Sequence, residues 1–334
     1  MKPNRSARTT LAIVALGIGV VTLSACSSSS SETTAPTDAT IAADATGAAD
    51  TTVIADSTPV AESSAASAAS ATSAAESSAA APSASGQATD MTSALQGAKW
   101  ASNVTVTIAD GKFRFVSDGL PNHERQAEYA LPNAGVRVPD ASTATAGADP
   151  TKAQSYDFQI PTVPVKAASP TDSSLGTIGV MISGAALFNP YEGDAKTVAM
   201  SSNFTVKNAK GEDIAFLDSC NGHPTPMGQY HYHALPKCVT SQVDTAGGPS
   251  HAIGVAFDGY LIYGDRDADG TQITKDQLDS CNGIISATPE FPEGVYHYVL
   301  LDTPDSASSI RCFTGTVDAS LTQMQGMGAM PPAQ

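Results

Sequence analysis

The feature that most constrains the fold of this chain is a segment that occurs twice. Leu-Asp-Ser-Cys-Asn-Gly at 217–222 recurs unchanged at 278–283, and a Tyr-His-Tyr sequence follows each copy, at 230–232 and at 296–298. Six identical residues followed by a second shared motif indicate a duplicated structural unit. We therefore expect one domain built from two related halves.

The N-terminus has the pattern of a bacterial export signal. Three basic residues precede an uncharged run at 11–23 that is too short to span a membrane comfortably. Leu-Ser-Ala-Cys then ends at Cys26 and resembles the lipobox of bacterial lipoproteins. The resemblance implies a signal peptide at 1–25 and acylation of Cys26, which would anchor the protein to the membrane on the extracytoplasmic side of the cell envelope. The alternative is an ordinary secreted protein with a free thiol.

Residues 26–92 are expected to form a disordered tether. Up to residue 90, this segment contains no aromatic residue after Cys26, no Lys and no Arg. It cannot bury enough apolar surface to offset the loss of chain entropy on folding. A second disordered segment is expected at 319–334. This segment contains Met324, Met327 and Met330, and thioethers select Cu(I) among soft metals. The favoured interpretation is nevertheless an ordinary flexible tail.

The net charge excludes one class of partner. The formal charge is −16, and removal of the three basic residues of the signal peptide takes it to −19, because residues 1–25 contain no acid. A basic face that binds nucleic acid or anionic lipid is therefore not expected. An acidic surface suits solubility outside the cell and the binding of cations.

Residues 93–318 are expected to form a single, mainly β, sandwich-like domain. Apolar and polar residues alternate on both sides of Asp110-Gly111, which is a strong signal for a β-hairpin. Long amphipathic helical patterns are absent from the sequence, so helices should be few and short, such as one at 274–278. Further strand-like runs occur at 179–182, 204–206, 253–257, 261–263 and 295–301.

Each copy of the repeat contains one cysteine and is followed by another. Four cysteines allow three pairings, and the repeat favours pairing within each copy, Cys220 with Cys238 and Cys281 with Cys312. Disulfides are chemically reasonable in an exported protein. The alternative, thiolate ligands for a metal, lacks close Cys-x-x-Cys spacing and would suffer oxidation outside the cell.

The histidines of the first copy form a candidate metal site. In Tyr-His-Tyr-His at 230–233, the two-residue period of a strand places His231 and His233 on one face and both tyrosines on the other. Two neighbouring neutral imidazoles can chelate copper or zinc, and the glycine turn before His223 allows a third to join them. His251 and His123 are candidates to complete or orient the site. The alternative is a network of Tyr and His hydrogen bonds inside a β core.

The second copy argues against two equivalent sites. Ile284 stands where the first copy has His223, and Val299 replaces the last histidine of the tetrad. Only His297 remains in the second copy. We therefore place the site mainly in the first copy, with His297 at most as an outer member.

These motifs resemble the YHYH family of bacterial secreted proteins, which is named after the tetrad at 230–233. Further segments similar to the family's pattern are Gly-Leu-Pro-Asn-His at 119–123, the stretch 179–190, and Ser-His at 250–251 followed by Phe-Asp-Gly-Tyr-Leu-Ile-Tyr-Gly at 257–264. The resemblance covers most of residues 100–317. Ser-Gly-Ala at 183–185 departs from the Asn-Gly-Val that is usual in the family. The resemblance implies a type of domain but no particular chemistry.

A second candidate cation site lies in the second half. Asp265, Asp267 and Asp269, followed by glycine, reproduce the D-x-D-x-D-G opening of calcium loops, and Asp276 occupies the twelfth position. Asp rather than Glu at position twelve departs from the usual loop, but the segment resembles dockerin-like loops, which tolerate closure by Asp. Calcium would have a structural role here. The alternative is a solvated acidic turn.

The sequence favours a lipoprotein of the cell envelope that binds copper or zinc. A competing hypothesis is a metal-dependent extracellular enzyme, a hydrolase or oxidoreductase, in which the same histidines hold the metal and Asp258 or Glu124 is the base. Neither H-E-x-x-H nor G-x-S-x-G occurs in the chain. A third hypothesis is an adhesion or structural module without metal, in which His231 and His233 diverge or lie on a solvated strand.

Overall fold

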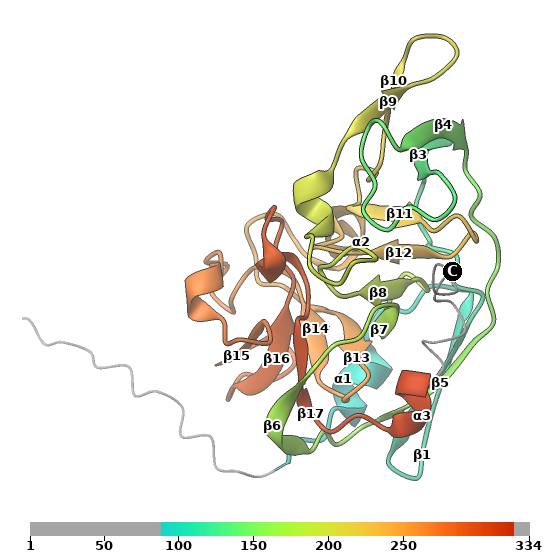
Figure 1. The fold of residues 1–334 in the computed structure, drawn as a ribbon. Coiled ribbons are helices and arrows are strands. Elements are labelled where there is room, and N and C mark those ends of the chain that lie inside the picture. The colour runs from blue at the N-terminus through green and yellow to red at the C-terminus, as the bar shows by residue number, and fades with distance from the viewer. Residues whose placement is uncertain (1–87, 324–334) are drawn as a thin grey trace, which may run out of the picture. The chain divides into compact units, whose positions relative to one another are not determined.

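The computed structural model describes residues 88–323 (Figure 1). The expected signal peptide, Cys26, most of the tether and the three methionines of the tail lie outside the described residues, so these interpretations stay predictions. Within residues 88–323, no helix has the length and apolar character needed to cross a membrane.

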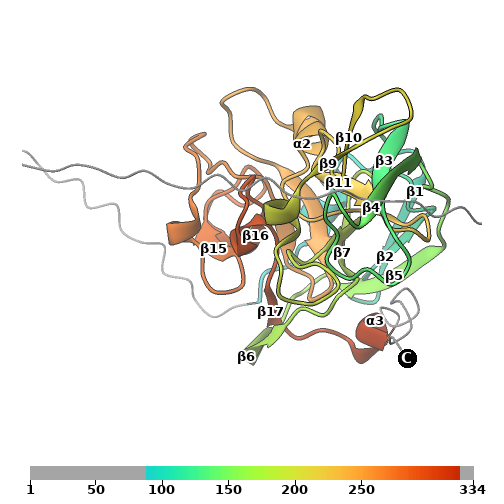
Figure 2. The same ribbon diagram turned by 45° about the horizontal axis from the view of Figure 1, so that its top comes forward.

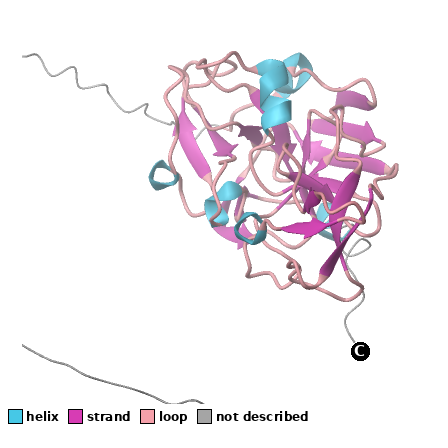
Figure 3. Cartoon of the chain, turned by 90° about the horizontal axis from the view of Figure 1, so that it is seen from above, coloured by secondary structure: helices cyan, strands magenta, loops and turns pink. Residues whose placement is uncertain are grey.

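β-Strands make up most of the regular secondary structure of residues 88–323 and helices are few and short, which confirms the predicted mainly β class (Figure 3). The main sheet has eight strands, in the order β11 (Gly222–Pro224), β12 (Tyr230–Tyr232), β8 (Ala186–Phe188), β7 (Thr177–Met181), β13 (Ala252–Ala256), β14 (Leu261–Tyr263), β16 (Val295–Val299) and β15 (Gly283–Ser286). The smaller sheets contain β1 (Val104–Ala109), β2 (Lys112–Ser117) and β5 (Tyr156–Pro161); β3 (Glu128–Pro132) and β4 (Ala144–Ala148); β9 (Thr205–Lys207) and β10 (Asp213–Ala215); and β6 (Lys166–Asp172) with β17 (Cys312–Gly315). The helices are α1 (Thr92–Gly97), α2 (Lys237–Val243) and α3 (Ala319–Gln323), with short 3-10 helices at Ala199–Ser202, Lys275–Gln277 and Ser306–Ser308.

The hairpin predicted around Asp110-Gly111 is present. Strands β1 and β2 pair antiparallel along their whole length. Asp110 and Gly111 form the turn with φ angles of 51° and 70°, the left-handed conformation that the tight turns of β-hairpins require. The alternation along β2 then buries Phe113 and Phe115 in the main core.

The duplication extends beyond the segments that the sequence repeat marks. Strands β7, β8, β11 and β12 of the first half correspond to β13, β14, β15 and β16 of the second, and β7 pairs with β13 in the middle of the sheet. Both halves share an irregularity, since the register shifts between Thr177 and Gly179 in β7 and between Ala252 and Gly254 in β13. Both also pair strands in parallel, β12 with β8 and β16 with β14. Two complete structural units therefore share one sheet.

The repeated hexapeptide folds into the same anchored turn in both halves. One carboxylate oxygen of Asp218 accepts hydrogen bonds from the backbone amides of Cys220 and Gly222, and the other accepts one from the hydroxyl of Tyr230. Asp279 accepts the three equivalent hydrogen bonds in the second half. The asparagine of each turn has a positive φ, 60° in the first half and 72° in the second, a conformation that Asn tolerates well. These contacts explain why the Asp and the Asn recur in both copies.

Both predicted disulfides are confirmed, Cys220–Cys238 and Cys281–Cys312. The first joins the anchored turn of the first half to helix α2. The second joins the equivalent turn of the second half to strand β17. Each disulfide therefore fastens one anchored turn to a neighbouring element.

The fold extends beyond the expected boundaries at residues 93 and 318. Met91 is fully buried, and helix α1 begins at Thr92. At the other end, helix α3 occupies residues 319–323, which we expected to belong to the disordered tail, and Leu321 is 2% exposed. Both extensions bury an apolar side chain in the main core, and this explains why residues outside the expected limits are ordered.

A small separate core lies beside the first half. The β9–β10 hairpin packs next to β3 and β4 (Figures 1 and 2). The buried side chains between these elements include Val206, Phe216 and Leu217. Phe216 also contacts the ring of His223 at a centroid distance of 4.3 Å. This core therefore covers one side of the histidine region.

The anchored turn makes a testable prediction at Gly283. A Cβ at this position would collide with the phenol of Tyr296, whose hydroxyl is held by Asp279. We expect Gly283→Ala to destabilise the domain by about 1–3 kcal/mol in urea unfolding, because the tyrosine must leave its packed position. Gly97→Ala is the control, since a Cβ there meets no atom within 4 Å apart from its chain neighbours and the backbone of its own helix. Equal stability of the two variants would contradict the proposed role of the turn.

Candidate metal centre

Three histidines of the first half converge at the end of the main sheet. His223 on β11 lies opposite His231 on β12, and His233 follows β12 directly. One ligand nitrogen from each of the three side chains lies within 4.8 Å of the others. Their exposed fractions are 7%, 2% and 3%, respectively, so the cluster is shielded from solvent. The structure thus brings together the three residues that we proposed as the main ligands.

Aromatic rings pack against the cluster. Phe188 of β8 stacks on His231 with a centroid distance of 3.8 Å and meets the edge of His233 at 5.8 Å. Phe216 packs against His223 from the neighbouring core. The phenylalanines restrict the imidazole rings and keep water away from them, because neither ring offers a hydrogen-bonding group.

The hydrogen bonds within the cluster need one more N–H group than a neutral His231 can supply. Nδ1 of His233 lies 2.7 Å from the carbonyl oxygen of Asn189, so it carries the proton and Nε2 presents a lone pair. Nδ1 of His231 lies 3.3 Å from the carbonyl oxygen of Gln229, and its Nε2 lies 2.9 Å from Nε2 of His233. A neutral His231 has only one N–H for these two acceptors. A metal ion bound to both Nε2 atoms would remove the conflict and leave each Nδ1–H bonded to a carbonyl, as is usual for metal-bound histidine.

Protonation is an unfavourable way to resolve this conflict. Burial, followed by the charge of neighbouring imidazoles, holds the pKa values of His223 and His231 well below the ordinary histidine value. Burial also lowers the pKa of His233 to about 4. The rings are therefore neutral at physiological pH. In addition, Nε2 of His223 is buried without any hydrogen-bond partner, which is costly unless another group binds it.

The tyrosines of the tetrad lie on the other face of β12, as the strand period predicted. Tyr230 donates a hydrogen bond to Asp218, which also accepts one from Tyr129. The hydroxyl of Tyr232 lies 3.0 Å from Oγ of Ser183 and 2.7 Å from a ring nitrogen of a histidine, His123. These bonds hold β12 from behind and so fix the direction in which its imidazoles point.

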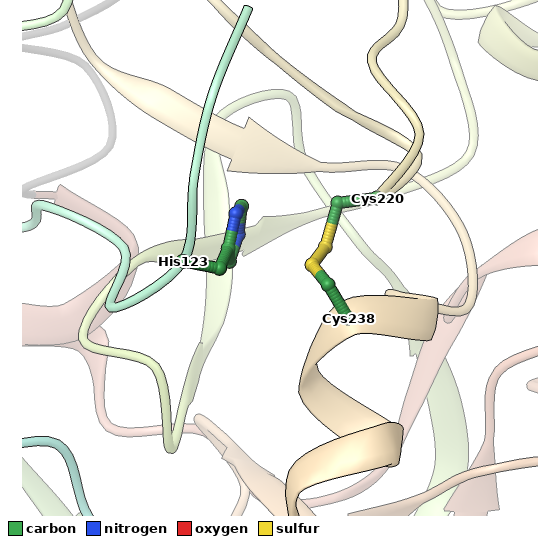
Figure 4. A group of neighbouring side chains, drawn as sticks. All are labelled: His123, Cys220 and Cys238. Carbon is green, nitrogen blue, oxygen red and sulfur yellow. A yellow bond between two sulfur atoms is a disulfide. The ribbon is translucent and has the colours of Figure 1, made fainter.

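His123 lies on this tyrosine face, next to the disulfide between Cys220 and Cys238 (Figure 4). Its Nε2 contacts the hydroxyl of Tyr232, and its Nδ1 lies 2.9 Å from the carbonyl oxygen of Glu124. The two sulfur atoms are bonded to each other and are therefore not thiolate ligands. His123 thus supports β12 and does not complete the histidine cluster.

Two other histidines that we considered lie apart from the cluster. His251 pairs with Asp244, whose carboxylate oxygen lies 3.2 Å from Nδ1. His297 lies on β16 in the second half, packs against Tyr263 and directs Nδ1 toward the carbonyl of Val295. Within residues 88–323, neither histidine belongs to a group of three convergent ligand atoms. The sequence shows that these histidines belong to one domain, but it does not show which of them lie close together in the folded sheet.

The four carboxylates of the predicted calcium loop are not gathered into a group of convergent ligand atoms within residues 88–323. Asp267 and Asp269 accept hydrogen bonds from backbone amides of the loop itself, and Asp265 accepts one from Gln272. Asp276 lies in the short 3-10 helix at Lys275–Gln277. Calcium binding by Asp265, Asp267, Asp269 and Asp276 therefore stays a prediction.

The two carboxylates considered as catalytic bases also lie outside the cluster. Asp258 is fully buried, accepts hydrogen bonds from Tyr298 and Gly315, and has a pKa raised by burial to about 6. Glu124 is exposed. Neither belongs to the group formed by the three histidines. The enzyme hypothesis therefore loses the bases that the sequence suggested for it.

The second half shows the same scaffold without the histidine cluster. Ile284 lies opposite His297 across β15 and β16, as His223 lies opposite His231 across β11 and β12. The position equivalent to His233 is occupied by Val299, which is fully buried. The scaffold therefore folds with apolar side chains at two of the three positions.

The sequence did not draw attention to one buried acid, which follows the residue that orients His233. Glu192 lies in the loop after β8, three residues beyond Asn189, whose carbonyl orients His233. It is 7% exposed, and its Oε1 has no hydrogen-bond partner. Burial raises the pKa of Glu192 to about 8, with a smaller contribution from the negative charge of Asp194. A single acid in a loop carries no periodic signal that would have identified it.

The raised pKa of Glu192 predicts a pH-dependent stability. The unfolded chain releases this proton near the ordinary value of 4.5, whereas the folded protein retains it until about pH 8. The stabilisation of the folded state by the protonated Glu192 side chain is therefore complete below pH 4.5 and is lost as the pH rises toward 8. We expect the stability of Glu192→Gln relative to the unchanged protein to increase over this range in urea unfolding. Glu124→Gln, at an exposed position, is the control, and parallel pH profiles for all three proteins would refute the prediction.

The fold and the site together define a class: a duplicated, disulfide-bonded β domain with a buried histidine cluster in one of its halves. Residues 157–277 and 265–315 match the family described as YHYH protein. The matched part of the chain, residues 157–315, is a YHYH domain, as the tetrad predicted. No curated protein and no solved structure matches the chain.

Proposed function

We propose that this protein binds one transition-metal ion, copper or zinc, through His223, His231 and His233. The proposal rests chiefly on the contact between Nε2 of His231 and Nε2 of His233, 2.9 Å apart, because Nδ1 of each of these two rings faces a carbonyl oxygen. Imidazoles whose other nitrogen is hydrogen-bonded to a carbonyl oxygen suit zinc and copper.

Comparison of the two halves supports the proposal that the three histidines bind a ligand and are not needed for packing. The second half has Ile284 and Val299 at two of the equivalent positions. An apolar side chain packs in a buried site without the cost of desolvating an imidazole. The histidines are therefore not required by the scaffold, and a bound metal ion accounts for their convergence.

The burial of the cluster favours a role in holding metal over a role in turnover. Catalytic metal sites keep a coordination position open to water or substrate, whereas structural and storage sites are closed. All three imidazoles are less than one tenth exposed. The convergence of His231 and His233 in a buried site also disfavours the adhesion hypothesis, which required them to diverge or to be solvated.

The proposed location is the extracytoplasmic face of the cell envelope. The export signal and the lipobox-like sequence that ends at Cys26 support a lipid anchor in the membrane. The two disulfides of the domain are consistent with an oxidising compartment. Labelling of cells with a radioactive or alkyne-bearing fatty acid, with Cys26→Ala as the control, tests the anchor.

Elemental analysis of the purified protein tests the metal site. We expect one equivalent of copper or zinc in the unchanged protein and loss of metal in the double variant His231→Ala, His233→Ala. The affinity should fall by more than about 100-fold, since loss of a group that merely orients a ligand already costs about 10–100-fold. His297→Ala is the matched control, because it removes a buried histidine from the equivalent position of the second half. Metal that persists in the folded double variant would contradict the proposal.

The duplication allows a gain-of-function test. The double variant Ile284→His, Val299→His places two histidines around His297, in the arrangement that the first half uses. We expect the folded variant to bind a second equivalent of metal, because both halves have the same strand pairing and the same anchored turn. Circular dichroism verifies folding, and a folded variant that still binds a single equivalent would show that the three positions alone do not make a site.

A further inference from the structure

We propose that the metal held by this cluster is monovalent copper, Cu(I), in a three-coordinate site. This inference rests on the proposed function and concerns which ion the site selects. The observations that carry it are the charge, the number and the surroundings of the ligand atoms.

The ligand set is electrically neutral. Three imidazoles form the group, and within residues 88–323 neither a carboxylate nor a thiolate joins it. The groups that contact the imidazoles are uncharged as well: the carbonyl oxygens of Asn189 and Gln229 and the rings of Phe188 and Phe216. The carboxylate of Asp218 accepts hydrogen bonds from Tyr129 and Tyr230, and Tyr230 lies on the face of β12 opposite to the histidines.

A neutral, buried site discriminates between ions by their charge. The energy needed to move an ion from water into a medium of low polarity increases with the square of its charge, so a divalent ion costs about four times as much as a monovalent one. Buried divalent ions normally have anionic ligands or a bound hydroxide to reduce this cost. Among residues 88–323, no carboxylate or thiolate belongs to the cluster, and its side chains are less than one tenth exposed, which limits the access of hydroxide from solvent. The site therefore favours an ion of single charge.

The number of ligands agrees with this assignment. Zinc in proteins is almost always four-coordinate, with water as the fourth ligand where the protein supplies three. Cu(I) is stable with three ligands in a plane and needs no water. A metal about 2.0 Å from each nitrogen at trigonal angles sets the nitrogens about 3.5 Å apart. The three ligand nitrogens lie within 4.8 Å of one another. The Nε2 atoms of His231 and His233 are 2.9 Å apart, so they would have to separate by only about 0.6 Å to reach this spacing.

Competition between metals tests the proposal on the full chain, purified in detergent and freed of metal. Cu(I), Ag(I) as a monovalent ion that does not change oxidation state, and Zn(II) are added without oxygen in the presence of a chromophoric chelator. We expect one equivalent of Cu(I) or of Ag(I) to bind, and Zn(II) to bind at least about 100-fold more weakly. X-ray absorption spectra at the copper edge should show three nitrogen neighbours.

The outcomes separate this inference from the proposed function. Zn(II) that displaces Cu(I), or a fourth ligand in the copper spectrum, would overturn the choice of ion and leave the metal site standing. Failure of all three ions to bind would overturn both. Glu192→Gln tests for a hidden anionic contribution. We expect its affinity for Cu(I) to be unchanged within about twofold, and a loss of more than about tenfold would contradict a neutral site.

Discussion

The carboxylate of Asp218 makes the contact on which the arrangement of the first half depends. One of its oxygens closes the turn that contains the disulfide-bonded cysteine, and the other holds Tyr230 against the back of β12. The turn leads directly into β11, so it sets His223 opposite His231. Side chains alternate along β12, and the tyrosines fixed on one face therefore direct His231 and His233 to the other. The position of all three imidazoles follows from this anchoring.

The two halves use one scaffold for two different interiors. Both have the anchored turn, the disulfide and the shifted register between their first two strands. They differ where the first half has His223 and His233, because Ile284 and Val299 occupy those positions in the second. Apolar residues stabilise a buried site without a partner, whereas buried imidazoles need one. The first half is therefore the structural unit with buried imidazoles that a metal ion would satisfy, and the second half is the same unit with apolar residues at two of those positions.

Much of this arrangement could be predicted from local patterns, and the rest depends on long-range pairing. The alternation in 230–233 correctly separates imidazoles from tyrosines, and the cysteine pairing follows from the repeat. The equivalence of 177–188 with 252–263 was missed, although Ile-Gly-Val recurs at 178–180 and 253–255. So short a match gains its meaning only from the strand register that the two segments share. The position of His123 behind β12 was missed for a related reason. It depends on a contact with Tyr232, 109 residues later, that no periodicity encodes.

The central claim is that the Nε2 atoms of His231 and His233 share one metal ion while both Nδ1–H groups bond to carbonyls. Nitrogen NMR of the imidazole side chains, recorded before and after addition of one equivalent of metal, tests it most directly. The account predicts that metal shifts both Nε2 resonances, and that both rings then carry their proton on Nδ1. Metal binding that leaves these two Nε2 resonances unchanged would contradict the account, because the ion would then lie elsewhere in the protein.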